Sequence, residues 1–294
     1  MDRHSASLCC IELPPTRRSN PRDRMLDGRR VMENLLGSED RVIPNPKYIE
    51  MVQQSRMTEG MRRQVVEWML EVCEETRAED ILLPLAVNLL DRILSQQFID
   101  RDHLQLTSAA CLFVASKVVQ AEPLEAKQLC IMSDNAFMPS FLTKMELIIL
   151  DRLKWDLTTA TPLNFLDLMY GLLPVTEDQI RIVKKHATAL VTLTCFEYRF
   201  IIYPPSVIAA AAACAAIQGM NMQLSNGQNP VVVLQEVTRT DLEILQACQA
   251  QIEESLARHL SLMADGSGEA DRLRGNNDNL PETDTPTEAL ESVF

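Results

Sequence analysis

The feature that most constrains the fold is the run SVIAAAAACAAIQG (206–219), in which almost every side chain is small and apolar. Pro204 and Pro205 precede it, and proline is favoured in the first turn of a helix, where no amide donor is needed. A helix that is small and apolar on every face has no side suited to water, so other helices must enclose it. The segment near 103–120 is similarly rich in small residues. The chain is therefore predicted to be all-α, with one buried central helix in each half.

Apolar residues recur at helical spacing on both sides of these central segments. Thr58, followed by Glu59 and Gly60, marks the start of the first such helix. These helices are expected near 61–72, 85–94, 125–133 and 139–153 in the first half, and near 165–171, 176–199 and 239–262 in the second. With about five helices in each half, the layout predicts two tandem five-helix bundles. Periodicity leaves one alternative open, a single irregular helical bundle.

The two ends of the chain differ in composition from this middle. Residues 1–45 hold four prolines, many arginines and little periodicity, whereas residues 265–294 are strongly acidic. The net charge is +3 over residues 1–30 and −6 over residues 265–294. Segments this polar cannot bury a core, so we expect both ends to be mobile tails.

Composition also bears on partners and on cellular compartment. The net charge of −13 disfavours non-specific binding to nucleic acid or to anionic membranes. No apolar run approaches the roughly 20 residues needed to span a bilayer, and the start MDRHSASLCC lacks the apolar core of a signal peptide. We therefore expect no nucleic-acid or membrane partner, and eight cysteines that stay reduced in the cytosol or nucleus.

Motifs that carry catalysis are not found. The sequence has no Gly-x-x-x-x-Gly-Lys, Gly-x-Gly-x-x-Gly, His-Glu-x-x-His or Gly-x-Ser-x-Gly pattern, and no Cys-x-x-Cys pair for zinc. The four histidines lie far apart among polar residues. We predict a partner-binding protein with no catalytic residue, no cofactor and no metal. An enzyme whose site assembles from distant residues is the alternative.

Four segments of the first half resemble the cyclin box. They are MRRQVVEWMLEVCEE (61–75), LPLAVNLLDRIL (83–94), FVASK (113–117) and KMELIILDRLKWDL (144–157). Their order and spacing are similar to those of D-type cyclins, and the resemblance runs from about residue 48 to residue 260. Ala78 departs from the pattern, which usually has a larger apolar residue or cysteine there.

The resemblance implies two five-helix cyclin boxes, at 46–157 and 158–264, between the tails. It also implies a function: a subunit that binds and activates a cyclin-dependent kinase of the four-and-six class and promotes passage from G1 to S phase, in nucleus and cytoplasm. The alternative is a cyclin-box protein of the transcription-initiation type that binds DNA. The net charge of −13 and the lack of a basic stripe argue against it.

Two charged residues stand within apolar stretches. Lys117 lies near the end of the expected helix that contains LFVASKVV, and Glu146 lies in FLTKMELIILDRL. By resemblance they match the family's paired lysine and glutamate, which contact the kinase. From the residues alone, Lys117 is expected to extend from a helix end and to pair with Glu146 within one molecule. Both expectations can hold at once.

The helix that begins near Met61 carries a second resemblance. Met61, Gln64, Val65 and Trp68 match the patch by which cyclins hold substrates and kinase inhibitor proteins bearing Arg-x-Leu. Met61 and Trp68 fit the pattern, while Gln64 replaces an apolar residue and should weaken an apolar groove. The alternative is an ordinary amphipathic helix whose apolar stripe faces the core, and for Val65 this alternative is favoured.

The N-terminal tail contains the pattern Leu-x-Cys-x-Glu at Leu8, Cys10 and Glu12. In an extended segment these three side chains point to one side and can enter a shallow groove. The motif resembles the one by which D-type cyclins dock to the pocket of the retinoblastoma protein. This resemblance implies a retinoblastoma-family partner. A chance match in a disordered leader is the alternative.

The acidic C-terminal tail contains Thr285 followed by Pro286. The site resembles the phosphorylation-dependent degradation signal of D-type cyclins, which implies recognition by a ubiquitin ligase. A phosphate adds about −1.5 to −2 charges and three acceptor oxygens that an arginine-bearing receptor can bind. Thr283 and Thr287 are neighbouring alternatives, and an unmodified tail is the other interpretation.

Overall fold

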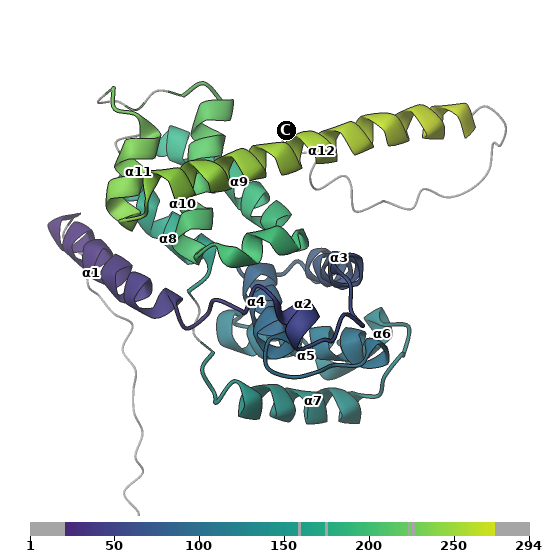
Figure 1. Ribbon diagram of the computed structural model, residues 1–294. Coiled ribbons are helices and arrows are strands. Elements are labelled where there is room, and N and C mark those ends of the chain that lie inside the picture. Colours follow the sequence, from purple (N-terminus) through teal and green to yellow (C-terminus); the bar gives the residue numbers. More distant parts are fainter. Residues whose placement is uncertain (1–20, 158–159, 174–175, 223, 225–226, 274–294) are drawn as a thin grey trace, which may run out of the picture.

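The computed structural model describes residues 21–157, 160–173, 176–222, 224 and 227–273, with side chains placed within residues 28–262. Every regular element in this part of the chain is a helix (Figure 1). The helices form two bundles, each with its own apolar core. The predicted all-α architecture of two tandem bundles is therefore confirmed. None of these helices is both long and apolar enough to cross a bilayer.

The N-terminal bundle is organised around one central helix. Its helices are α2 (Tyr48–Met51), α3 (Glu59–Glu75), α4 (Leu82–Leu94), α5 (Leu104–Val119), α6 (Ala126–Met132) and α7 (Pro139–Arg152), with a short 3-10 turn, η1 (Arg101–His103). All residues of α5 from Thr107 to Ser116 are buried, as its small side chains predicted. Thr58 caps α3 by accepting a hydrogen bond from the backbone N–H of Met61 at 3.2 Å, so the predicted helix start is also confirmed.

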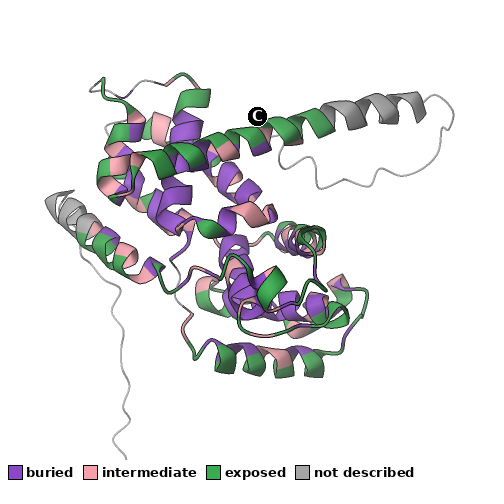
Figure 2. Ribbon diagram, viewed as in Figure 1, coloured by how far each residue is buried: buried purple, intermediate pink, exposed green. Residues whose placement is uncertain are grey.

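The C-terminal bundle repeats this arrangement. Its elements are α8 (Pro162–Tyr170), α9 (Glu177–Phe196), η2 (Tyr198–Ile202), α10 (Pro205–Gly219), α11 (Pro230–Thr238) and α12 (Leu242–Leu273). The alanine-rich α10 is buried from Pro205 to Ile217 and contacts α8, α9, α11 and α12. Figure 2 shows this concentration of buried residues at the centre of each bundle. The periodicity did not predict α11, which Asn229 and Pro230 start.

The prediction of a tail over residues 1–45 is wrong for the second half of that range. Residues 21–39 form helix α1 (Pro21–Glu39), and Met32 and Val42 are buried in the core of the C-terminal bundle. The apolar side of α1 is short and interrupted by charges, so it has no clear periodicity in the sequence. Residues 1–20 lie outside the described part. At the other end, α12 continues to Leu273, past the predicted boundary at residue 264.

The segment from Glu39 to Tyr48, here called the strap, runs across the junction of the two bundles. Its two ends form hydrogen bonds with the C-terminal bundle and its middle forms hydrogen bonds with the N-terminal bundle. The contacts are Ser206 N–H and Oγ–H to the Glu39 carboxylate (3.1 and 3.0 Å), Asn88 Nδ2 to the Val42 carbonyl (2.7 Å), the Asn45 N–H to Ser95 Oγ (3.0 Å) and the Tyr198 hydroxyl to the Pro46 carbonyl (2.7 Å). The strap therefore helps to fix how the bundles sit against one another.

A buried charge completes the junction. The Arg62 side chain is only 2% exposed, and its Nε and Nη2 donate to the two carboxylate oxygens of Asp91, each at 2.7 Å. Its Nη1 donates to the Cys195 carbonyl of α9 at 2.9 Å, and the Tyr48 hydroxyl donates to Asp91 at 2.8 Å. Burial disfavours the charged guanidinium, but the attraction of Asp91 outweighs it and holds the pKa of Arg62 above its ordinary value. Helices α3, α4 and α9 are thus tied at one point.

Candidate partner-binding site

The two charged residues singled out in the sequence meet on the surface of the N-terminal bundle. Lys117 lies in the last turn of α5, where that helix leaves the core, and Glu146 lies in the middle of α7. The Lys117 Nζ donates to Glu146 Oε1 at 2.6 Å, and the ammonium also lies 3.8 Å from the centre of the Phe113 ring. The predicted pair within one molecule is therefore present.

The pair is held in place and is also accessible. The Glu146 side chain is 14% exposed, whereas that of Lys117 is 42% exposed. The ring of Phe113 and the carboxylate restrain the ammonium from two sides, by a cation–π contact and by a charged hydrogen bond. One side of Lys117 remains open to solvent, so a partner can approach a cation whose position is already fixed.

Exposed apolar residues lie next to this pair in the sequence of both helices. Leu147 follows Glu146 directly and is 63% exposed, and Val118 follows Lys117 and is 40% exposed. Phe141, 46% exposed, is another apolar side chain that α7 leaves open to solvent, although α7 already buries Leu142, Ile149 and Leu150 in the core. A helix at the edge of a bundle that exposes further apolar side chains, besides those that it buries in its own core, is typical of a protein interface.

The turn after α7 adds a large aromatic residue to this region. Lys154 and Trp155 have φ angles of 52° and 58°, in the left-handed region that side chains other than glycine seldom adopt. Trp155 is 70% exposed, the largest fraction among the large apolar side chains described. The backbone bond from Trp155 N–H to the Leu150 carbonyl, 2.9 Å long, holds the turn in this form. A strained turn that presents a tryptophan to solvent points to a contact with a partner.

The structure divides the residues of the predicted docking patch. Val65 is buried in the core at 8% exposure, as the alternative for that residue proposed. Met61 and Trp68 are half-buried, Gln64 is exposed, and the Trp68 indole N–H donates to the Met132 carbonyl of α6 at 3.2 Å. The accessible part of the patch is thus formed by Met61, Gln64 and Trp68. Leu8, Cys10, Glu12 and Thr285 lie outside the described residues.

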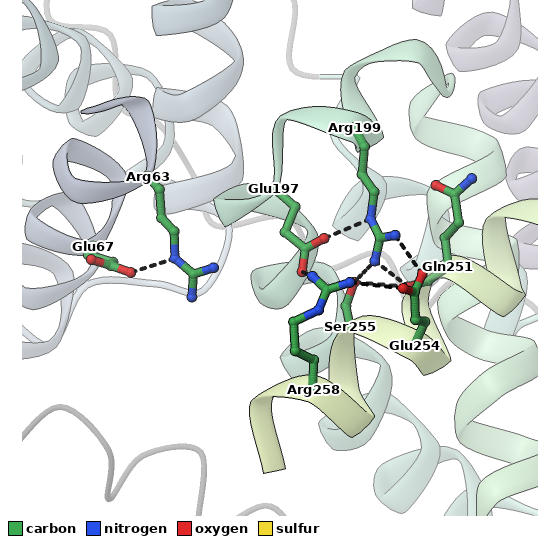
Figure 3. Close-up of polar contacts among 8 residues, drawn as sticks. All are labelled: Arg63, Glu67, Glu197, Arg199, Gln251, Glu254, Ser255 and Arg258. Atoms are coloured by element: carbon green, nitrogen blue, oxygen red, sulfur yellow. Dashed lines mark hydrogen bonds and ion pairs between the residues drawn. The ribbon is translucent and has the colours of Figure 1, made fainter. Parts of the chain in front are cut away.

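A charged ring that sequence reasoning missed links η2 to α12 (Figure 3). Its members alternate in charge and each contacts the next. The contacts are Glu197–Arg199 (2.7 Å), Arg199–Glu254 (2.6 Å), Glu254–Arg258 (2.9 Å) and Arg258–Glu197 (3.5 Å). The hydrogen bond from Arg199, together with its positive charge, lowers the pKa of Glu254. The i, i+4 spacing of Glu254 and Arg258 was the only sequence signal for it. Each of the four side chains pairs with opposite charges within the ring, which we therefore interpret as a structural link.

The described part of the chain offers no metal or thiol chemistry. It holds no group of three or more His, Cys, Asp or Glu residues that could bind a metal. Six cysteines within it are buried and form no disulfide bond. Burial raises the pKa of Cys73 to about 12, so its thiol is protonated and unreactive at neutral pH.

Comparison with known proteins gives a consistent result. The family model "Cyclin, N-terminal domain" matches residues 30–158, and "Cyclin, C-terminal domain" matches residues 160–264. The G1/S-specific cyclin-D2 of Gallus gallus is 40% identical over 257 residues, covering 86% of this chain and 88% of that protein. The G1/S-specific cyclin-D1 of Danio rerio is 39% identical, with the same coverage of each.

A solved structure shows the same fold. The viral cyclin from Herpesvirus saimiri superposes with a TM-score of 0.68 at 22% identity, covering 79% of this chain and 99% of that one. The first family match begins at residue 30, so it also includes the last turns of α1 and the strap. This agrees with the structure in placing these residues inside the folded unit.

Proposed function

The chain belongs to the cyclin family, whose members are regulatory subunits of kinases and not themselves enzymes, and we propose its specific role. It binds and activates a cyclin-dependent kinase of the four-and-six class, directs the kinase to retinoblastoma-type substrates and promotes the G1/S transition. The similarity to cyclins D1 and D2 over most of the chain supports this choice within the family.

The observation that carries the proposal is the pair of Lys117 and Glu146 beside exposed Leu147. A protein kinase is active only when the glutamate of its αC helix pairs with the β3 lysine, so a protein that binds αC in that position favours the active state. The apolar residues on and around α7 supply area for such a helix. The restrained charges supply register, because a misplaced partner removes water from them without offering a hydrogen bond of its own.

The variant Lys117→Glu tests this role. It sets a second carboxylate next to Glu146 and removes the cation offered to the kinase. We expect kinase affinity to fall at least ~100-fold, which is about 3 kcal/mol and within the range for truncating an interface charge pair. The fold should persist, because the Lys117 side chain is 42% exposed. Binding is measured by calorimetry or by capture of the purified kinase.

A matched control is available in the other bundle. Lys184 pairs with Asp167 at 2.6 Å and its side chain is 53% exposed, so Lys184→Glu makes the same charge change in a comparable ion pair far from α7 in the sequence. This control should keep full kinase affinity. Normal kinase binding by Lys117→Glu, or equal loss in both variants, would show that the pair is not the kinase contact.

Substrate selection is assigned to two further elements. Leu8, Cys10 and Glu12 dock the retinoblastoma-type substrate, so Cys10→Gly combined with Glu12→Lys should weaken substrate capture and spare kinase binding. Met61 and Trp68 hold substrates and inhibitor proteins bearing Arg-x-Leu, and exposed Gln64 makes this groove weaker than a fully apolar one. Loss of kinase binding in the double variant would mean that the N-terminal segment is not a separate docking element.

Turnover and location complete the proposal. Phosphorylated Thr285 in the acidic C-terminal segment is recognised by a ubiquitin ligase, and the protein acts in both nucleus and cytoplasm. The phosphate supplies the charge and acceptor oxygens that such recognition requires. Thr285→Ala should lengthen the lifetime of the protein in cells, as measured after synthesis is blocked. An unchanged lifetime would remove Thr285 from this role.

A further inference from the structure

We propose that the cleft between the end of α3 and α9 binds an extended segment of a partner protein in which a basic residue stands beside an apolar one. The cleft lies where the two bundles meet, since α3 and α4 both contact α9 there (Figure 1). Its volume of about 570 Å³ is within the range of protein sites that bind ligands. The inference does not depend on the contact with a kinase.

The cleft is separate from the docking patch on the same helix. Cys73 lines the cleft, whereas Gln64 belongs to the patch. These two residues are nine positions apart, which is two and a half turns of an α-helix, so they point to opposite sides of α3. Of the described residues that line the cleft, none belongs to the patch.

The turn that ends α3 leaves this cleft open. The Arg77 N–H donates to the Glu74 carbonyl at 3.0 Å, the Ala78 N–H donates to the Cys73 carbonyl at 2.9 Å, and Arg77 has a φ angle of 50°. These bonds define a Schellman motif, in which the residue at the position of Ala78 commonly packs an apolar side chain against the last turn of the helix. Ala78 supplies only a methyl group, so space remains beside Cys73. This is also the position at which the sequence departs from the cyclin-box pattern.

The inner part of the cleft is apolar. Its most buried lining residues are Leu83 and Cys73, which are 3% and 8% exposed. Leu70, Ala78 and Ala189 are half-buried, whereas the charged residues that line the cleft are exposed and form its rim. This arrangement suits an apolar side chain that enters between charged groups.

The basic side chains on the α9 side of the rim already have partners. Lys184 pairs with Asp167 at 2.6 Å, and Arg181 pairs with Asp178 at 4.0 Å. Lys185 also has an interaction of its own. These cations are therefore less available to a ligand than their number suggests.

The carboxylates on the other side of the rim are unpaired. No hydrogen bond or ion pair joins the side chains of Glu74, Glu79 or Asp80 to any other described residue, and Arg77 is the only rim cation that likewise has no partner in this part of the chain. Glu74 lies in the last turn of α3, where the helix dipole opposes a negative charge. Burial and the charge of Glu71 raise the pKa of Glu74. Three unpaired carboxylates against one guanidinium favour a ligand that brings positive charge.

The shape of the site favours a chain segment as the occupant. A second hollow of about 420 Å³ shares Glu79, Asp80, Lys184 and Thr188 with the cleft and continues it. An extended segment can follow both hollows, which a compact small molecule cannot do. A second copy of this chain is disfavoured because its net charge of −13 makes copies repel each other.

The test selects peptides with the full chain. A displayed library of random short peptides is captured on the wild-type chain, and every peptide that the variant Ala78→Leu also captures is removed. The remaining peptides are synthesised with a fluorescent label, and their affinity is measured by anisotropy. We expect them to carry Lys or Arg directly beside Leu, Ile, Met or Phe. Ala78→Leu should stay folded, with a urea midpoint no lower than that of the wild type, because leucine supplies the contact that the turn lacks.

Two variants that play no part in the selection separate the apolar contact from the charged one. Ala189→Met narrows the cleft from α9 and should lower peptide affinity at least ~10-fold, the lower end of what burial of one large apolar side chain contributes. It also replaces Ala78→Leu in the selection if that variant does not fold. Glu79→Lys with Asp80→Lys should lower the affinity at least ~5-fold at low ionic strength and less in about 1 M salt, because exposed charges are screened.

Two controls should keep the wild-type affinity. Met61→Ala alters the docking patch on the opposite side of α3, and Glu122→Lys with Glu125→Lys makes the same change in net charge between α5 and α6. The inference is overturned if Ala78→Leu captures every peptide that the wild type captures, or if the peptides it loses are acidic. It is also overturned if Ala189→Met or the charge reversal leaves the affinity unchanged, or if Met61→Ala lowers it, which would place the peptides on the docking patch.

Discussion

Replacement of Arg62 by methionine should be among the most destabilising single changes at the junction of the two bundles. Methionine keeps much of the side-chain volume and removes the guanidinium. Three hydrogen bonds of 2.7 to 2.9 Å are lost, two to Asp91 and one to the Cys195 carbonyl. Asp91, whose side chain is 4% exposed, then retains only the Tyr48 hydroxyl as a partner. Removing one member of a buried ion pair costs about 3–5 kcal/mol, because an uncompensated charge stays buried.

The two tryptophans make the assay selective. Trp68 and Trp155 both belong to the N-terminal bundle, so tryptophan fluorescence follows that bundle while circular dichroism follows all helices. At a slope of about 2 kcal/mol per molar urea, the fluorescence midpoint of Arg62→Met should move down by roughly 2 M. The dichroism transition should broaden or split, because the bond from Arg62 to α9, one of those that couple the bundles, is gone.

Two further variants decide whether the reasoning is correct. In Arg62→Met with Asp91→Leu no charge is buried, so most of the lost stability should return. Arg63→Met changes an exposed neighbour that bonds only to Glu67, and it should cost less than about 0.5 kcal/mol. A loss below about 1 kcal/mol in Arg62→Met, or no recovery in the double variant, would refute the assignment of a buried, charged pair.

Two other predictions concern the C-terminal bundle. Ala212→Leu adds three carbons to a fully buried position of α10 and should lower the free energy of unfolding by about 1–3 kcal/mol or more, as measured by urea titration followed by dichroism. Burial raises the pKa of Glu39 above its ordinary value of 4.5. At pH values between the ordinary and the raised pKa, the folded chain binds more protons than the unfolded chain. The contribution of Glu39 to stability therefore falls as pH rises. Glu39→Gln should therefore flatten the decline in stability from about pH 4.5 upward, and an equal decline in both proteins would contradict the assignment.

The central helices were predictable because their composition suits one environment only. In α10, a run of alanines with flanking Val207 and Ile208 has neither a polar face for water nor the bulk to cover another helix. Such a segment can be stable only inside a ring of larger helices. The pairing of Lys117 with Glu146 was predictable for a similar reason, since each is a charge with apolar neighbours and needs a partner of opposite sign.

Helices α1 and α11 were not predicted, for two different reasons. The sequence of α11, PVVVLQEVT, is dominated by β-branched residues, which have low helix propensity and form a helix here because the core of the bundle receives Val231 and Leu234. In α1 the buried contribution comes from few residues among many charges, and its key contact joins Glu39 to a residue 167 positions away. Tertiary packing decides both cases, and local patterns do not contain it.

The pair of Arg62 and Asp91 could have been inferred with a stricter use of periodicity. Arg62 and Arg63 look alike in the sequence, but Arg62 precedes Val65, Val66 and Met69 by three, four and seven residues and so shares the buried face of α3. Arg63 instead faces solvent with Glu67. An arginine on a core face requires a carboxylate nearby, and Asp91 lies in the equally apolar LLDRIL of the next helix. Opposite charges at core positions of two neighbouring helices therefore predict a buried pair. The same pattern does not predict the third partner, the Cys195 carbonyl, which only the structure shows.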